Sequence, residues 1–479
     1  MDSIDQEHVD KKLLDCPDII RKKVCLNGCN GCFYYIGGLV DTDLLQRDFI
    51  NPVLSLTIKD LSDPDGVANL PGNESKPVYD INEAIMSIIS GEAVFICGDL
   101  PYAISCSLKK FDKRSIEEPE VEKNIRGPHE GFIEALDSNL AILRRKIKNN
   151  ALKFKTITLG EQTHQTVAIA YIEGITNIEI VNGLYEKISR INIDGLPAIG
   201  YVEQMVTSHP YSIFPQYLAT ERPDRAMAAL LEGRIVVLQE GTPVVMIAPV
   251  NFITFFQAVD DYSTSWIHGS FLRLVRIAAI IIAVSFPALY IAITSFHYYV
   301  VPLNILITLA ESRSKVPFPP VIEVLILEAI VEMIHEAAIR LPTYIGTAIS
   351  VFASLVIGTA AVEAGIVSNI LIIIVAASAV ASYVIPSFDM SLAIRILRLF
   401  FIIAAAVFGV IGIVICTGLA LVHLVRMESL GQPYFQPLSP FDLQGLKDSL
   451  LRLPIKALDK RPRITKTKNL YRGGNNGRK

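Results

Sequence analysis

The stretch that decides the fold is LFFIIAAAVFGVIGIVICTGLALV, Leu399 to Val422, which contains no Lys, Arg, Asp or Glu. Three further stretches share this property: Ile277 to Phe296, Leu341 to Val362 and Ala364 to Phe388. Each is about 20 residues or longer, the length that a helix needs to cross a hydrocarbon core roughly 30 Å thick. The sequence therefore predicts a membrane protein with four full spans.

The region before the first span has ordinary charge density and is long enough to bury one or two cores of its own. It begins with MDSIDQEHVDKK, which has no apolar segment of the kind found in cleavable signals. We therefore expect a cytoplasmic α/β or α+β region in two subdomains, followed by an α-helical transmembrane domain. The predicted parts are a variable Cys-containing N-terminus (1–30), a first small α/β subdomain (31–108), a linker (109–128), a second α/β subdomain (129–265), the transmembrane domain (266–425) and a basic cytoplasmic tail (426–479).

Two hairpins are predicted in the second subdomain. Thr156 to Leu159 and Val167 to Tyr171 are β-rich runs separated by a polar turn, and RIVVLQ and VVMIAP flank Glu240-Gly241-Thr242. Helical patterns at His129 to Lys148, Ile178 to Ser189 and Arg225 to Glu232 alternate with these strands.

The charge distribution bears on topology and partners. The formal net charge is only −4, which gives no electrostatic reason to expect nucleic acid, but residues 426–479 hold 12 Lys and Arg against 4 Asp and Glu. A basic tail beside a last span indicates the cytoplasmic side and attraction to anionic lipid. With both termini cytoplasmic, the number of crossings must be even, and four crossings satisfy this condition.

The segment after the first span is less regular. Val300 to Ala310 is apolar but too short to cross comfortably, and Pro317-Phe318-Pro319-Pro320 follows the polar turn ESRSK. We expect a re-entrant or interfacial helix here, since a full crossing would change the parity and place one terminus outside.

An acidic stripe follows the prolines. On the predicted helix from Val321 to Leu341, Glu328, Glu332, His335 and Glu336 fall on one narrow face at about 100° per residue. A carboxylate facing lipid costs several kcal/mol, so this face should meet water, a protein partner or a pore.

Glu363 lies between two apolar stretches with almost no loop around it, either at the membrane interface or along a pathway. The candidate pore or vestibule residues are Glu328, Glu332, Glu336 and Glu363.

The candidate metal-binding and catalytic motifs are incomplete. His335-Glu336 lacks the second His that H-E-x-x-H zinc sites need, and Glu332 with His335 is a single E-x-x-H where di-iron bundles need two. Cys25, Cys29 and Cys32 have the C-x3-C-x2-C spacing of radical iron–sulfur enzymes, but a thiol-rich loop outside a βα barrel is the simpler interpretation. No phosphate-binding or nucleophile motif occurs, so we predict no catalytic site and no cofactor.

Several short motifs together resemble one family. From about Gly91 to Pro440 the chain resembles the GerA-type A subunit of bacterial spore germination receptors, a family that includes the related stage V sporulation membrane protein. The matching motifs are RGPHEGFIEAL (126–136), YIEGITN (171–177), INIDG (191–195), SHPYSIFPQ (208–216), ERPDRAMAALLEGR (221–234), GSFLRLVR (269–276), FPALYIA (286–292), VPFPP (316–320) and AAVEAGIVS (360–368).

The resemblance implies a non-enzymatic protein of the spore inner membrane, with both termini on the spore core side, that assembles with B-type and C-type receptor subunits. It further implies a homo-oligomer, with a pentamer as the expected state, acting as a cation channel that opens when nutrient binds. The RGPHEGFIEAL and ERPDR motifs are expected to hold the fold or subunit contacts. Two other functions stay open: a non-conducting scaffold or signalling subunit, and a secondary transporter, although no internal repeat is visible.

Overall fold

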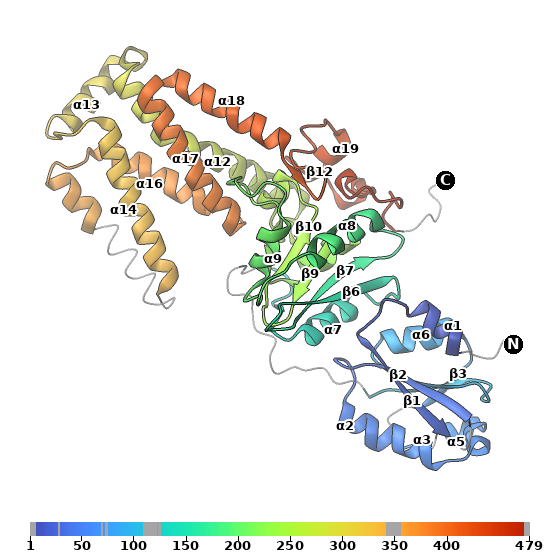
Figure 1. Ribbon diagram of the computed structural model, residues 1–479. Coiled ribbons are helices and arrows are strands. Elements are labelled where there is room, and N and C mark those ends of the chain that lie inside the picture. The colour runs from blue at the N-terminus through green and yellow to red at the C-terminus, as the bar shows by residue number, and fades with distance from the viewer. Residues whose placement is uncertain are drawn as a thin grey trace.

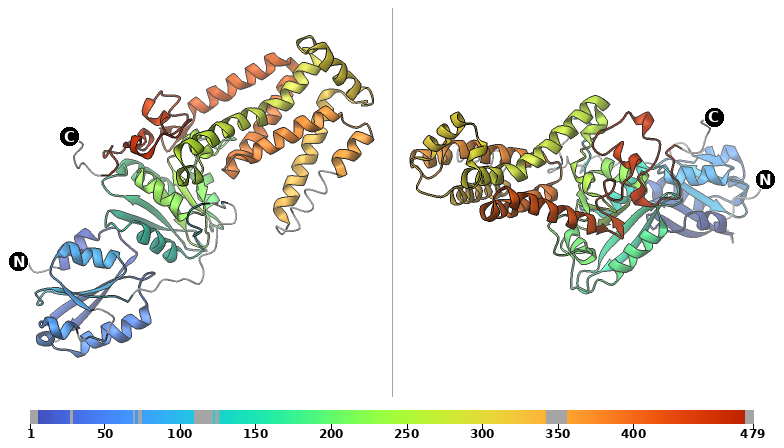
Figure 2. Two further views of the ribbon diagram at one scale, coloured as in Figure 1. Left: turned by 180° about the vertical axis from the view of Figure 1, so that it is seen from behind. Right: turned by 90° about the horizontal axis from the view of Figure 1, so that it is seen from above.

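The computed structural model describes residues 6–26, 29–68, 70–71, 75–108, 122, 126–341 and 356–473. These residues form two sheet-containing subdomains and a helical region (Figure 1). The helical region and the first subdomain lie at opposite ends of the molecule, with the second subdomain between them (Figure 2). The predicted class, two α/β or α+β subdomains before a helical region, is confirmed at this level. The predicted linker falls almost entirely outside the described residues.

The first subdomain is a five-stranded antiparallel sheet in the order β1-β2-β4-β5-β3. The strands are β1 (Ile19–Leu26), β2 (Cys29–Ile36), β3 (Lys76–Val78), β4 (Ala93–Cys97) and β5 (Ala103–Cys106). Both faces are covered, because helices pack above and below the sheet (Figure 1). Helices α1 (Gln6–Lys12) and α6 (Ile81–Ile89) cover one face; α2 (Thr42–Leu44), η1 (Leu45–Ile50), α3 (Asn51–Ser55), α4 (Ile58–Leu61) and α5 (Pro64–Ala68) cover the other.

The N-terminal segment belongs to this subdomain. Residues 6–26, which we expected to form a separate part of the chain, supply α1 and the edge strand β1. Val9 of α1 and Leu13, which directly follows the helix, are fully buried against β2 and β4. Cys25 and Cys29 stand in paired strands rather than in the thiol-rich loop that we expected.

The second subdomain is a five-stranded antiparallel sheet in the order β6-β7-β9-β10-β8. Its elements are α7 (Leu136–Lys146), β6 (Leu152–Leu159), β7 (Gln165–Ile172), α8 (Ile178–Ser189), α9 (Ile199–Val206), β8 (Leu218–Thr220), α10 (Pro223–Leu231), β9 (Ile235–Gln239) and β10 (Val245–Ala248). Both predicted hairpins are confirmed, β6 with β7 and β9 with β10. Helices α8 and α9 cover one face, and α7 and α10 cover the other.

The helical region contains helices of 4 to 30 residues, several of which are apolar. They are α11 (Asp260–Ser263), α12 (Trp266–Ser295), α13 (Leu303–Arg313), α14 (Pro320–Arg340), a helical stretch at 356–363, α16 (Asn369–Tyr383), α17 (Phe388–Phe408) and α18 (Val410–Arg426), with short 3₁₀ turns at Phe252–Phe256 (η2) and Tyr298–Val300 (η3). Among the described residues, α12 and α17 are long and apolar enough to cross a membrane, and α16 and α18 are shorter apolar helices. The span predicted at Leu341 to Val362 lies largely outside the described residues.

The single span predicted from Leu399 to Val422 is wrong, because the chain reverses at Gly409. Gly409 has φ +62°, a conformation that strongly favours glycine, and a Cβ there would press on Phe296 and His297. Gly412 lies so close to the Ala404 carbonyl that a side chain would not fit. Helices α17 and α18 therefore form a tight antiparallel hairpin (Figures 1 and 2).

Contacts between the helices give the direction of each pass. We call the end of the helical region beside the second subdomain proximal and the opposite end distal. Helix α12 starts proximal, and the residues that follow it pack on Gly409 at the distal end. Helix α16 starts distal, where Ser368 and Tyr290 share a hydrogen bond of 3.2 Å, and ends where Ser391 Oγ donates to Ser382 O at 2.9 Å.

Helix α14 also runs from distal to proximal, from Glu323 beside Ser368 to His335, which stacks on Tyr383 with ring centroids 5.1 Å apart. The stretch 356–363 leads back to the distal level, where Gly365 packs on Lys315. Among the described residues, α12 and α17 therefore run from proximal to distal, whereas α14, α16 and α18 run from distal to proximal.

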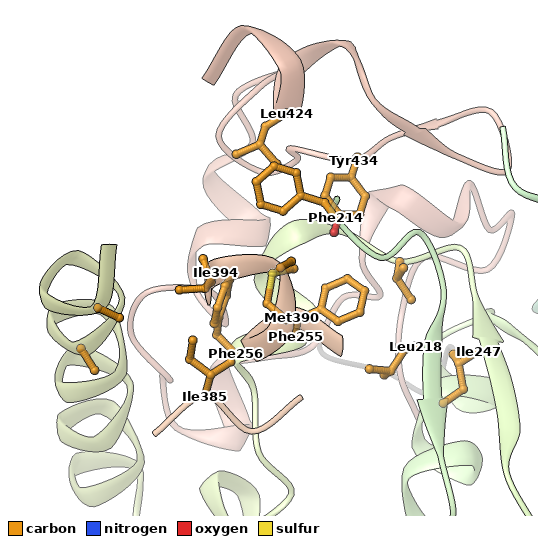
Figure 3. Close-up of a cluster of buried hydrophobic side chains, with 14 of the residues drawn as sticks. Phe214, Leu218, Ile247, Phe255, Phe256, Ile385, Met390, Ile394, Leu424 and Tyr434 are labelled. Carbon is orange, nitrogen blue, oxygen red and sulfur yellow. The ribbon is translucent and has the colours of Figure 1, made fainter. Parts of the chain in front are cut away.

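One hydrophobic core joins the second subdomain to the helices. Figure 3 shows side chains from three parts of the chain meeting at the proximal end. Phe214, Leu218 and Ile247 come from the second subdomain, Phe255 and Phe256 from η2, Ile385, Met390 and Ile394 from α17 and the turn before it, Leu424 from α18, and Tyr434 from the tail. The second subdomain therefore packs directly against α17, α18 and the tail.

The C-terminal tail folds onto the second subdomain and the base of α12. It contains β11 (Glu428–Ser429), β12 (Gln432–Pro433), α19 (Leu443–Leu446) and short 3₁₀ turns at Ile455–Ala457 (η4) and Arg463–Thr465 (η5). Arg461 Nε donates to Leu231 O at 2.8 Å, and Arg472 Nη2 donates to Glu232 Oε1 at 2.8 Å. These arginines serve internal contacts, and lipid binding by the tail stays a prediction.

Candidate functional site

The acidic stripe of α14 faces another helix of the same subunit. Glu328 is 2% exposed and lies 3.1 Å from Arg398 of α17. Glu332 accepts from Arg395 Nη1 at 2.6 Å and also lies 3.5 Å from Arg398. Arg398 Nη1 donates to Ser378 Oγ of α16 at 3.0 Å, so that three helices meet in one ion-pair cluster.

Helical spacing explains why the two acidic residues meet the two arginines. Glu328 and Glu332 are four residues apart on α14, and Arg395 and Arg398 are three apart on α17, so each pair shares a helix face. Two carboxylates meet two guanidiniums, and the formal charge of the cluster is zero. Charges buried among apolar helices persist when they are paired in this way. Within one subunit, the charges of Glu328 and Glu332 are thus balanced by Arg395 and Arg398.

The other two candidates lie apart from this cluster. Glu336 is exposed near the proximal end of α14 and pairs with Arg340 at 2.5 Å. Glu363 is exposed near the distal end, at the last residue of the stretch 356–363. The structure therefore does not bring the four predicted carboxylates to one site within a subunit.

A second buried carboxylate, Glu323, was not among the predicted site residues. It is fully buried, lies 3.2 Å from Arg313 of α13 and accepts from Ser368 N at 3.3 Å. Because Ser368 is the N-cap of α16, the carboxylate sits at the positive end of that helix dipole. Glu323 lies at the distal ends of α14 and α16 and thereby ties them to α13. Its place in the first turn after the proline run was the available signal.

The GSFLRLVR motif forms the proximal base of α12. Asp261 of α11 is fully buried and accepts from Arg273 Nε at 3.2 Å and from Arg276 Nη1 at 2.7 Å. Gly269 lets the helix approach the Asp261 carbonyl, which would lie 2.9 Å from a Cβ. Ser270 Oγ donates to Arg452 O at 2.9 Å and thus joins the helix to the tail.

Asp448 of the tail completes this base network. Its carboxylate lies 3.0 Å from Arg273 Nη1 and accepts from the Tyr262 hydroxyl at 2.8 Å. Burial raises the pKa of Asp448, and burial also raises the pKa of Tyr262, which keeps the phenol protonated as a donor. The network couples the tail, α11 and α12 at the point where the helical region begins.

The ERPDR motif has a structural role, as expected. Arg222 is 3% exposed, forms a two-bond pair with Asp224 at 3.0 and 2.7 Å, and donates to Pro128 O at 3.2 Å. Arg225 pairs with Glu122. These contacts fasten the end of the connecting segment to the start of α10.

The described residues hold no group of three His, Cys, Asp or Glu side chains that could bind a metal ion. Cys25 is exposed, Cys32 is buried, and Cys29 donates a hydrogen bond to Asp99. The hydrogen bond to Asp99 raises the pKa of the Cys29 thiol to about 11, which disfavours the thiolate that a metal needs.

Comparisons with known proteins agree over most of the chain. The family model described as Bacillus/Clostridium GerA spore germination protein matches residues 7–464. Spore germination protein KA of Bacillus subtilis (strain 168) is 37% identical over 451 residues, which cover 93% of this chain and 82% of that protein. Spore germination protein GerQA of Bacillus cereus is 38% identical over 456 residues, covering 95% and 91%.

One further relative is described as a membrane protein, and one solved structure matches the N-terminal half of this chain. The uncharacterized membrane protein YfkQ of B. subtilis is 35% identical over 450 residues, covering 93% of this chain and 88% of that protein. The crystal structure of the N-terminal domain of the A subunit of the Bacillus megaterium spore germinant receptor GerK3 shares 26% identity, with a TM-score of 0.38, and covers 51% of this chain and 93% of that one.

Proposed function

Because this chain belongs to the GerA spore germination protein family, as an A subunit of a germinant receptor and not an enzyme, we propose that it couples nutrient sensing to cation release across the spore inner membrane. It acts with B-type and C-type subunits, and both of its termini lie on the spore core side. The family match over residues 7–464 is the observation that carries this proposal.

The cation pathway is formed between subunits of a homo-oligomer, for which a pentamer is the proposed state. The neutral pairing of Glu328 and Glu332 with α17 supports this arrangement, because it balances the two carboxylates that lie between the described helices of one subunit. Glu336 and Glu363, which are exposed on the outer surface of the helices, are the remaining candidates for an axial lining.

The shared core at the proximal end couples the second subdomain to the helices. The second subdomain, α17, α18 and the tail pack around Phe214, Met390 and Tyr434, so a partner subunit that moves the second subdomain also moves the α17–α18 hairpin. The hairpin carries Arg395 and Arg398, which hold α14. This chain of contacts supports a route from a sensing partner to the helices.

A non-conducting signalling subunit is the second candidate, favoured by the same internal neutralisation of the acidic stripe. Potassium efflux from vesicles that contain the purified chain, alone and with its B and C partners, separates the two. We expect efflux in at least one preparation. A folded oligomer that conducts in neither preparation would contradict the channel and leave the signalling role.

A further inference from the structure

The SHPYSIFPQ motif carries an aromatic side chain that the function above does not use. Tyr211 is 100% exposed, whereas Phe214 of the same loop is 3% exposed in the core of Figure 3. One end of the loop is therefore anchored in the protein, and its tip presents a phenol ring outward.

The loop is built to hold this ring in place. Residues 209–212 form a tight turn in which Ser212 N donates to His209 O at 3.1 Å, with Pro210 and Tyr211 at its centre. The Gln216 side chain is almost fully buried. It accepts from the backbone N–H groups of Ser208 and His209 at 3.2 Å each and donates to His209 O at 2.8 Å. A fully exposed tyrosine on a braced turn is presented at low entropic cost, as in preorganised binding surfaces.

The turn lies at the proximal end of α18. Ser212 Oγ and His423 Nε2 share a hydrogen bond of 2.9 Å, and Ser212 Oγ also lies 3.2 Å from Met427 Sδ. His423 is in the last turn of α18, directly after the exposed apolar residues Leu421 and Val422. The turn that carries Tyr211 therefore lies beside the last turn of this apolar helix.

Other elements of this part of the chain carry further exposed apolar side chains. Tyr201 and Met205, four residues apart on one face of α9, are 48% and 56% exposed, and Phe388 at the start of α17 is 49% exposed. The cations Lys187, which donates to Ser208 Oγ at 3.3 Å, and Arg426 are exposed around them. Aromatic rings beside basic residues at the ends of apolar helices are typical of the interface between a bilayer and water.

We propose that the Ser208–Gln216 loop is a membrane anchor, with the Tyr211 ring seated among lipid headgroups at the proximal face. This inference rests on the proposed membrane placement of the helices. The anchor would hold the second subdomain against the bilayer while the shared core transmits motion. The occupant is lipid rather than a protein, because Ser212 and His423 join the turn that carries the ring to the end of the apolar helix α18.

The full-length chain in vesicles of phosphatidylcholine and phosphatidylglycerol tests this directly. Trp266 is the only tryptophan in the sequence, so Trp266→Phe gives a silent background in which a single tryptophan reports its own depth. Three variants are compared: Tyr211→Trp, Ile403→Trp on the exposed side of α17, and Tyr79→Trp, an exposed site in the first subdomain. Each is read with lipids brominated near the headgroup or near the chain end.

We expect Tyr211→Trp to lose most of its emission with bromine near the headgroup and little with bromine near the chain end. Ile403→Trp should show the reverse order, and Tyr79→Trp should show no quenching. If Ile403→Trp is quenched and Tyr211→Trp behaves like Tyr79→Trp, or is blue-shifted without quenching, the ring meets water or protein and the anchor is overturned. If Ile403→Trp is also unquenched, the membrane placement itself fails.

Discussion

Arg398 of α17 and Glu328 of α14 form an ion pair at 3.1 Å in which both side chains are at most 2% exposed. The pair fixes α14 against the α17–α18 hairpin, since both charges lie among apolar helices with Ser378 as the additional partner of Arg398. The stripe of acidic residues is thus largely a packing device within the subunit.

Removal of one partner of this pair should destabilise the helical region. Glu328→Gln leaves Arg398 with weaker acceptors, and Arg398→Met leaves a buried carboxylate without its partner. Breaking a buried ion pair in this way lowers the free energy of unfolding by about 3 to 5 kcal/mol. Denaturant unfolding in detergent measures this loss. The double variant Glu328→Leu/Arg398→Met should recover most of it, and the exposed pair is the matched control, since Glu336→Gln should cost less than about 0.5 kcal/mol.

The reversal at Gly409 makes a second prediction. Gly409→Ala forces a Cβ into a glycine-favouring backbone conformation and against His297 and Phe296, so it should cost at least about 1 to 3 kcal/mol. Gly418→Ala is the control within α18, because nothing lies within 4 Å of its added Cβ and alanine favours a helix by about 1 kcal/mol. Equal melting temperatures for the two variants would contradict the hairpin.

Removal of the Asp261 charge should destabilise the contacts at the proximal end of α12. Asp261→Asn leaves Arg273 and Arg276 without their shared carboxylate, and the contact between α11 and α12 weakens. Because Arg273 and Ser270 also hold the tail, we expect faster proteolysis within residues 440–460. Glu186→Gln, a change at a 68% exposed side chain, should leave the cleavage rate unchanged.

Stability should depend on pH through Glu203 of α9. Burial, with a smaller contribution from the Asp389 charge, raises the pKa of Glu203 to about 7 from a usual value of 4.5. The folded state therefore holds the proton more tightly than the unfolded state, and this contribution to stability is present below about pH 4.5 and is lost as pH rises through about 7. Glu203→Gln should flatten the dependence of melting temperature on pH in this window. An unchanged slope would contradict the assignment.

Sequence reasoning predicted what local pattern determines. The two hairpins of the second subdomain follow from alternation, and the apolar runs of α12, α16 and the second half of α17 follow from the absence of charge. Gly409 was not recognised as a turn, because a continuous apolar run satisfies a spanning helix and a helical hairpin equally well. The choice between them depends on how closely Gly409 and Gly412 let backbone segments approach.

The partners of the acidic stripe were missed for a similar reason. The spacing of Glu328 and Glu332 predicts a shared face but says nothing of what covers it. Arg395 and Arg398 lie more than 60 residues away along the chain and stood just outside an apolar stretch, where flanking cations are ordinary. Tertiary packing brings the two faces together.

Potassium efflux from vesicles that contain the assembled receptor, compared across charge variants, tests most directly whether the pathway lies between subunits. We expect Glu336→Gln and Glu363→Gln to reduce efflux. The double variant Glu328→Gln/Arg398→Gln, which removes one charge of each sign, should leave the conductance of folded receptors near the wild-type value. The opposite result would contradict the proposal and move the pathway to the interior of the subunit. In that case the Glu336 and Glu363 variants would conduct normally, and the Glu328/Arg398 double variant would abolish efflux in folded receptors.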